Sequence, residues 1–253
     1  MSGGITVVVH RDAAVLAEAV AARLLTRLAD AQASRGWASV VLTGGTIGIA
    51  ALEAVRRSPV RAAVDWSHVD VWWGDERFVD AASDDRNELQ ARRALLDDLV
   101  LDPARVHPMG SPAAFGTAEE AAAAYAAELT AAAAPGLDVP LIDVLLLGMG
   151  PEGHVASIFP ESPAAHDART AFAVHDCPKP PPTRVSLGFS ALQEAREVWV
   201  IVAGAEKATA VSMALGGAGQ VQVPAAGARG SAGTLWLLDE PAAQQLPRTL
   251  RRH

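Results

Sequence analysis

Ile-Asp-Val-Leu-Leu-Leu-Gly-Met-Gly-Pro-Glu-Gly-His, residues 142–154, indicates the fold more clearly than any other stretch of this sequence. Residues 142–147 form an almost uninterrupted aliphatic run, which is typical of a parallel strand buried on both faces of a sheet. Glycines and a proline follow immediately, so the strand is expected to end in a loop. The stretch therefore predicts a central parallel strand with a glycine-rich loop at its carboxyl end.

The segments on either side of residues 142–147 alternate between strand-like and helix-like patterns. Apolar, β-branched runs predict strands over 5–9, 39–42, 69–73, 197–202 and 234–237. Helices are predicted from a cap at Asp12 to about 34, then up to about 57, over 87–96, 118–133 and 206–215, and near the C-terminus. The proline-rich chain after residue 147 is expected to be irregular through residue 182. This alternation predicts a single α/β domain over residues 1–253, with a mostly parallel sheet and helices on both faces.

The composition narrows the possible classes of protein. Half of the residues are apolar, which indicates a globular protein with a sizeable core. The net charge of −8, without a basic tract, argues against general nucleic-acid binding. No apolar run approaches the roughly 20 residues of a membrane span, and residues 1–10 lack the features of a signal peptide. Cys177 is the only cysteine, so no intramolecular disulfide can form and a cytoplasmic location is expected.

Thr43-Gly44-Gly45-Thr46 lies between a predicted strand and a predicted helix. Glycines permit close backbone approach, and a helix N-terminus offers unpaired N–H groups to a phosphate. No Gly-Lys-Ser/Thr sequence follows, so this is not a Walker A loop. The alternative is a tight turn in which Thr46 caps the helix. Both interpretations remain open from the sequence.

The loop after residue 147 matches the spacing of a dinucleotide-binding fingerprint, Gly148-x-Gly150-x-x-Gly153. That function needs a helix of several turns next, and the prolines at 160 and 163 leave room for about two turns at most. The loop instead presents His154 at a strand's carboxyl end, where a neutral imidazole can take a proton from water. Glu152 either orients that imidazole or is solvated.

Three further cations are candidates for binding an anion. Gly74-Asp75-Glu76-Arg77 follows a predicted strand, and its alternative interpretation is a solvated turn with a local ion pair. Arg184 follows the proline-rich loop of residues 178–182. Lys207 is expected in the first turn of a helix, where the helix dipole opposes a cation. The alternative interpretation of both Arg184 and Lys207 is an ordinary surface charge.

Other catalytic patterns are missing from the sequence. There is neither a Gly-x-Ser-x-Gly elbow nor a His-Glu-x-x-His or clustered Cys/His signature, so no metal site is expected. Cys177 precedes Pro178 with no evident base nearby, which favours a structural thiol over a nucleophile.

Taken together, these motifs resemble the 6-phosphogluconolactonase family, a branch of a wider family with glucosamine-6-phosphate deaminase and ribose-5-phosphate isomerase. The resemblance rests on Leu-Thr-Gly-Gly-Thr at 42–46, Trp-Gly-Asp-Glu-Arg-Phe-Val at 73–79 with Asn87, residues 147–160, Pro-Thr-Arg-Val-Ser at 182–186, Gly204 with Lys207, and Leu-Trp-Leu-Leu-Asp at 235–239. It runs over nearly the whole chain in the right order. The sequence departs from the family pattern at Glu152, where Asp is usual, and at Thr43 and Ile47, where Ser and Pro are common.

The resemblance implies a modified doubly wound α/β fold, no cofactor, and hydrolysis of a phosphorylated sugar lactone in the oxidative pentose phosphate pathway. By position, His154 matches the general base, with Glu152 beside it. Arg77, Arg184 and Lys207 match substrate-binding cations, and Gly44, Gly45, Thr46 and Asp75 complete the predicted site. The number of subunits is not predicted.

Two other functions remain as alternatives. The first is an isomerising deaminase acting on glucosamine 6-phosphate. In that branch an Asn-Glu-Pro segment typically follows the histidine loop, and an aromatic residue follows Asp-Glu. This chain instead has Ala-Ser-Ile-Phe-Pro at residues 156–160, and Arg77 follows Asp-Glu. The second is a module that binds a sugar phosphate without turnover, against which His154 argues.

Overall fold

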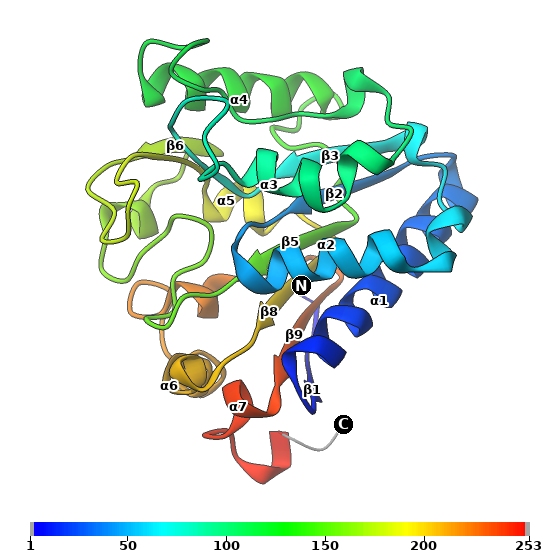
Figure 1. Cartoon of the computed structure of the whole chain (residues 1–253). Coiled ribbons are helices and arrows are strands. Elements are labelled where there is room, and N and C mark those ends of the chain that lie inside the picture. Colours follow the sequence, from blue (N-terminus) through cyan, green and yellow to red (C-terminus); the bar gives the residue numbers. More distant parts are fainter. Residues whose placement is uncertain (1–2, 251–253) are drawn as a thin grey trace.

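The computed structural model describes residues 3–250, so residues 1–2 and 251–253, the two ends of the predicted domain, lie outside the described residues. Six strands form the main sheet, in the order β1-β9-β8-β5-β2-β3, and every neighbouring pair is parallel (Figure 1). The strands are β1 (Ile5–His10), β2 (Ala38–Leu42), β3 (Val69–Trp73), β5 (Val144–Gly148), β8 (Glu197–Val202) and β9 (Gly233–Asp239). The expected strands are therefore confirmed to within two residues.

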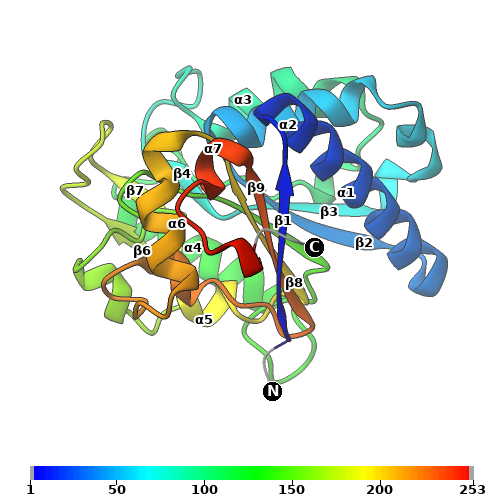
Figure 2. The same ribbon diagram turned by 90° about the horizontal axis from the view of Figure 1, so that it is seen from below.

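Helices cover both faces of this sheet. On one face lie α1 (Ala13–Arg35), α2 (Gly45–Arg57) and α3 (Asn87–Ala94), and on the other α4 (Ala118–Ala132), α5 (Phe189–Leu192), α6 (Ala208–Leu215) and α7 (Glu240–Ala243) (Figure 2). Alternate residues of β5 enter the two cores, because Leu145 and Leu147 face α4 and α5, whereas Val144 and Leu146 face α1 and α2. A strand buried on both faces is what the aliphatic run predicted.

A second, smaller sheet was not expected from the sequence. It contains β4 (Asp75–Arg77), β7 (Arg184–Leu187) and β6 (Ala171–Val174), in the order β4-β7-β6, with antiparallel pairs. The prediction that the chain is irregular through residue 182 was therefore wrong for β6. These strands contain only three or four residues, and β4 consists entirely of charged residues, so none shows a recognisable period.

The order of the main sheet brings two loops together at its carboxyl edge. β2 and β5 are neighbours, but the chain continues from β2 to β3 on one side and from β5 to β8 on the other. Such a switch point leaves a crevice between the two strand ends. The backbone N–H of Gly74 donates to Leu42 O at 3.0 Å, and that of Gly148 donates to Thr43 Oγ1 at 3.1 Å. The three predicted strand-end motifs therefore meet at one place.

Among the α-helices of residues 3–250, side chains cap the starts of α1, α4 and α7. Asp12 caps α1 as expected, since its side chain accepts a hydrogen bond from the Val15 N–H at 2.8 Å. Lys207 lies just before α6, at the end of a short 3-10 turn, rather than in the first turn of the helix. Within residues 3–250, no helix has both the length and the apolar character needed to cross a membrane.

Candidate active site

A cleft of about 340 Å³ opens at the carboxyl edge of the main sheet, a volume suited to a small ligand. It is lined by Thr43, Gly44, Gly45, Thr46, Ile47, Asp75, Arg77, Asn87, Gly148, Met149, Gly150, Pro151, His154, Ala156, Phe159, Lys179, Pro180, Arg184 and Lys207. Every residue of the predicted site lines this cleft except Glu152, which lies outside the lining and contacts His154 Nδ1. Segments far apart in the sequence thus converge on a single cavity.

The glycine loop presents the start of α2 to the cleft. Gly44 is the N-cap residue and Gly45 has a φ of 81°, a backbone conformation that favours glycine. No side chain caps α2, so the N–H groups of its first turn are left for a ligand. The alternative in which Thr46 caps the helix is wrong, because Thr46 is the second residue inside it. A side chain at Gly44 would collide with the Asn87 amide.

His154 is hydrogen-bonded to Glu152 on one side and faces the cleft. Its Nδ1 lies 3.0 Å from Glu152 Oε1. This hydrogen bond lowers the pKa of Glu152 to about 2 despite the opposing effect of burial, so the carboxylate is ionised and can only accept. Nδ1 therefore carries the proton, and Nε2 is the unprotonated nitrogen of the neutral ring. Glu152 is therefore in hydrogen-bond contact with the imidazole, as an orienting carboxylate would need to be.

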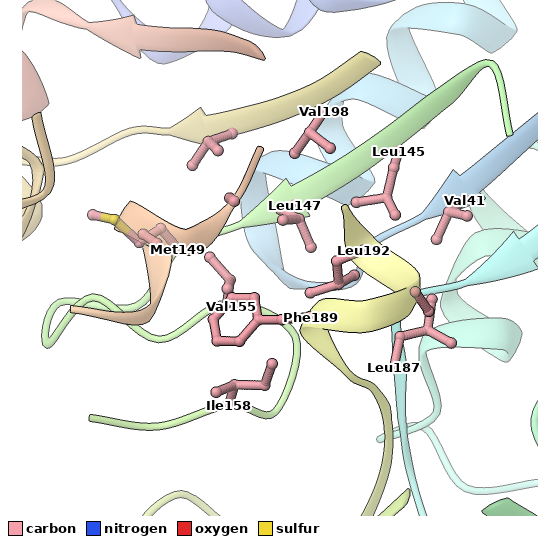
Figure 3. Packing of buried hydrophobic residues seen from close by; sticks show 14 of the residues in the cluster. Val41, Leu145, Leu147, Met149, Val155, Ile158, Leu187, Phe189, Leu192 and Val198 are labelled. Carbon is pink, nitrogen blue, oxygen red and sulfur yellow. The ribbon is translucent and has the colours of Figure 1, made fainter. Parts of the chain in front are cut away.

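Packing beneath the loop fixes the position of this histidine. The imidazole lies against the Phe159 ring, with centroids 4.5 Å apart, and a side chain at Gly150 would occupy the space of the imidazole. Val155 and Ile158, which follow His154, are fully buried and lie beside Phe189 (Figure 3). Hydrophobic contacts thus support the loop that carries His154.

Asp75 and Glu76 are buried, so the interpretation of residues 74–77 as a solvated turn is wrong. Asp75 Oδ2 accepts a hydrogen bond from Ser157 Oγ at 2.7 Å, which links β4 to the histidine loop. Glu76 accepts from the N–H groups of Asn87 and Glu88, at 2.7 and 2.9 Å, and so takes the place of a missing side-chain cap on α3. Burial raises the pKa of Glu76.

Arg77 does not pair with the acids that precede it in the sequence. Its Nη1 donates to the Asp85 carbonyl oxygen at 2.6 Å and to Asn87 Oδ1 at 2.7 Å. Asn87 in turn donates through Nδ2 to the Asp75 carbonyl oxygen at 2.8 Å. These contacts hold the guanidinium at the wall of the cleft without neutralising its charge, which leaves it able to attract an anion.

Arg184 and Lys207 are both partly desolvated cations of the cleft. Arg184 is 6% exposed and donates to the carbonyl oxygens of Lys179, Pro180 and Pro181, while its Nη1 is 4.0 Å from Asp75 Oδ2. Burial lowers the pKa of Arg184 and also that of Lys207. A desolvated cation gains more from an anionic ligand than a hydrated one does.

Sequence reasoning did not assign a role to three side chains at or beside the cleft: Asn87, Ser157 and Lys179. Asn87 and Ser157 occur inside the matched motifs but bear no charge that would single them out. Lys179 is the single non-proline residue within 178–182, which was its one available signal. Its Nζ donates to Glu152 Oε2 at 3.1 Å.

The described part of the chain contains no group of three or more His, Cys, Asp or Glu residues arranged to hold a metal ion. Cys177 is buried, and this burial raises the pKa of its thiol. A protonated, buried thiol suits the structural role expected for this residue.

The cleft at the carboxyl edge of the parallel sheet is lined by a glycine loop, by His154 with its partner Glu152, and by four cations, Arg77, Lys179, Arg184 and Lys207. Such a combination is typical of an α/β enzyme that acts on a small anionic substrate. The family described as glucosamine-6-phosphate isomerases/6-phosphogluconolactonase matches residues 11–236. Because this match covers most of the sequence, the chain belongs to that family.

Individual members of this family show which proteins the chain is similar to. The 6-phosphogluconolactonase of Streptomyces coelicolor is 57% identical over 255 residues, covering 99% of this chain and 98% of that protein. The 6-phosphogluconolactonase of Mycobacterium tuberculosis is 50% identical, covering 93% and 96%. The solved structure of the Trypanosoma brucei 6-phosphogluconolactonase is 28% identical with a TM-score of 0.82, covering 96% and 98%. The expected resemblance and fold class are confirmed.

Proposed function

We propose that this chain hydrolyses 6-phospho-D-glucono-1,5-lactone to 6-phosphogluconate in the oxidative pentose phosphate pathway. The observation that carries the proposal is the pair of His154 and Glu152, which opens onto the same cleft as the uncapped start of α2. The first feature provides a base for water and the second a phosphate site. High identity to 6-phosphogluconolactonases along almost the whole chain supports this choice of substrate.

The phosphate end of the substrate is assigned to the glycine loop and Lys207. Thr46, Ile47 and Lys207 line the cleft and also a neighbouring cavity, so Lys207 lies close to the start of α2. Backbone N–H groups, the positive end of the helix dipole and a desolvated ammonium group together suit a dianion. The lactone ring then extends toward His154, so phosphate binding orients the carbonyl for attack.

Hydrolysis needs no covalent intermediate in this arrangement. His154 Nε2 takes a proton from water as its oxygen attacks C1 of the lactone, and Glu152 stabilises the resulting imidazolium. Arg77 and Arg184 are the cations left to stabilise the oxyanion of the tetrahedral intermediate. When the bond from C1 to the ring oxygen breaks, the imidazolium returns its proton to that oxygen. The new carboxylic acid then ionises in water, which leaves the enzyme unchanged.

The direct test is hydrolysis of the lactone by purified protein, measured as acid release above the spontaneous rate. The proposal expects a large acceleration with the lactone and no ammonia from glucosamine 6-phosphate. Ammonia release at a comparable rate would place the chain in the deaminase branch. Binding of 6-phosphogluconate without any acceleration would make the protein a sugar-phosphate-binding module.

The proposed function also predicts the domain organisation, cofactor requirement, partners and location of the protein. We expect one domain over residues 1–253, no cofactor and no nucleic-acid partner. A cytoplasmic location remains a prediction that rests on the single cysteine, Cys177, and on the proposed pathway.

A further inference from the structure

We propose that Lys179 is a positioning residue, which acts on His154 through Glu152 and sets the pH range in which the histidine works as a base. The inference rests on the proposed function, because it assigns a further residue to the same reaction. Neither the family match nor the sequence motifs assign a role to the contact between Lys179 Nζ and Glu152 Oε2.

The two oxygens of Glu152 have different partners. Oε1 lies 3.0 Å from His154 Nδ1, and Oε2 accepts from Lys179 Nζ at 3.1 Å. A glutamate side chain has three rotatable bonds, and these two contacts restrain both oxygens of its carboxylate. Lys179 therefore holds the carboxylate in the position where its other oxygen faces the imidazole.

The backbone of Lys179 is itself fixed by a buried arginine. Arg184 Nε donates to the Pro181 carbonyl oxygen at 2.7 Å, and Nη2 donates to those of Lys179 and Pro180 at 3.0 and 3.3 Å. The base of this loop is closed by a hydrogen bond from the Cys177 N–H to the Pro182 carbonyl oxygen, at 3.0 Å. These hydrogen bonds restrain the loop backbone, so the Lys179 ammonium group is held near Glu152.

Besides positioning Glu152, Lys179 has an electrostatic effect on the His154 imidazolium. An ammonium group beside the carboxylate offsets part of the negative charge that favours the imidazolium. Lys207 is a second cation that interacts with Glu152 and with Lys179, so removal of Lys179 should only partly increase the stabilisation that Glu152 gives the imidazolium. Because Lys179 is 45% exposed on its side chain, solvent and salt weaken this effect, and a modest displacement is expected.

The experiment compares pH profiles of kcat/KM for wild type, Lys179→Met and Lys179→Arg, at about pH 5.5–7.5, where imidazole titrates. Methionine keeps the apolar stem and removes the charge. The acid limb of the profile should move to higher pH by about half a unit in Lys179→Met and return toward wild type in Lys179→Arg. Arg169→Met, which removes an exposed cation paired with Asp167 outside the cleft, should leave the limb in place.

A double-mutant cycle with Glu152→Gln then separates positioning from substrate binding. If Lys179 acts through Glu152, Lys179→Met should add little in the Glu152→Gln background. A raised KM with an unmoved acid limb, or an equal loss in both backgrounds, would overturn the proposal in favour of a direct substrate contact.

A second readout needs no turnover. The titration of the His154 imidazole, followed by NMR in protein without substrate, should move upward in Lys179→Met. An unmoved titration would refute the role of Lys179 even in an active enzyme. If the wild-type protein shows no lactone hydrolysis but the titration moves, the proposed function fails and the coupling of the two residues stands.

Discussion

His154 and His107 are both paired with a glutamate, yet their surroundings differ. His154 has one carboxylate, at Nδ1, and its ring faces the cleft. His107 is held between two carboxylates, with Nδ1 2.6 Å from Glu128 Oε1 and Nε2 3.6 Å from Asp70 Oδ1. Its ring also stacks on Trp72, with centroids 3.7 Å apart and planes 8° from parallel.

This difference shows that pairing with a carboxylate does not by itself make a histidine a catalytic base. Burial alone would lower the pKa of His107, but the carboxylates of Asp70 and Glu128 outweigh it and raise that pKa. Carboxylates near both nitrogens favour the protonated form of His107, and its Nε2 is buried without a hydrogen-bond partner, so it cannot take a proton from bulk water. His154 lines the cleft and only its Nδ1 has a carboxylate partner, so Nε2 is the nitrogen that a proposed base would use.

Removing the phosphate group from the substrate is expected to have a large effect, because the cleft beside His154 includes the uncapped start of α2. Unphosphorylated gluconolactone should react with a kcat/KM lower by about 10²–10³-fold, because it forfeits several charge-assisted hydrogen bonds. Gly44→Val should likewise abolish binding of 6-phosphogluconate, since a side chain there collides with Asn87. Steady-state kinetics with both lactones and calorimetry of product binding measure these effects. Equal turnover of the two lactones would contradict a phosphate role for the glycine loop.

Arg77 provides the next largest effect. Its guanidinium is held by Asp85 and Asn87 at the cleft wall, and the net charge of −8 leaves few cations to replace it. Arg77→Ala should lower kcat/KM by at least about 10-fold. Arg77→Lys should restore only part of that loss, because lysine keeps the charge but lacks the planar guanidinium fork. A rise in KM would indicate a ground-state contact, and a fall in kcat an oxyanion contact. Unaltered kinetics would remove Arg77 from the site.

The two glutamates allow a matched comparison. Glu152→Gln should lower kcat by about 10-fold, because the neutral amide no longer stabilises the imidazolium or fixes the ring. Glu128→Gln makes the same chemical change beside His107 and should leave kcat unaltered. The measurement is kcat at saturating lactone for both variants. A similar loss in both would mean that the effect arises from general stability.

The smallest effect on activity is expected at His107, where stability should change instead. Because the pKa of His107 is raised on folding, its stabilising contribution is complete below about pH 6.5, its unfolded value, and is lost as pH rises through the higher folded pKa. His107→Phe keeps a stacked ring but removes both nitrogens, and should cost on the order of 1 kcal/mol at pH 6. Urea unfolding of both proteins from pH 5 to 9 should show the difference narrowing at high pH. A constant difference would contradict a charged His107.

The main sheet was predictable because its strands are long, apolar and separated by helices with clear periodicity. Ile142 to Leu147 and the segment 197–202 each correspond to an observed strand, β5 or β8. The small sheet was not predictable, since β4 and β7 have no period of their own and depend on each other for pairing. Local sequence carries no information about such a long-range pairing.

The same limit applies to the site. Residues at strand ends, such as Gly44 and His154, could be placed because carboxyl ends of parallel strands meet at one edge. The burial of Glu76 and the contact of Lys179 with Glu152 arise from segments more than ten residues apart in the sequence. Sequence alone predicts that charged residues such as Glu76 are exposed, because their burial depends on tertiary contacts.

The central claim is that His154, unlike His107, activates water. The most direct test measures kcat and 6-phosphogluconate affinity for His154→Ala beside His107→Ala under identical conditions. Loss of a general base predicts a kcat lower by about 10²–10⁴-fold in His154→Ala with product affinity retained, and near wild-type turnover in His107→Ala. Near wild-type kcat in His154→Ala, at full occupancy by substrate, would contradict the account and assign the base to another group.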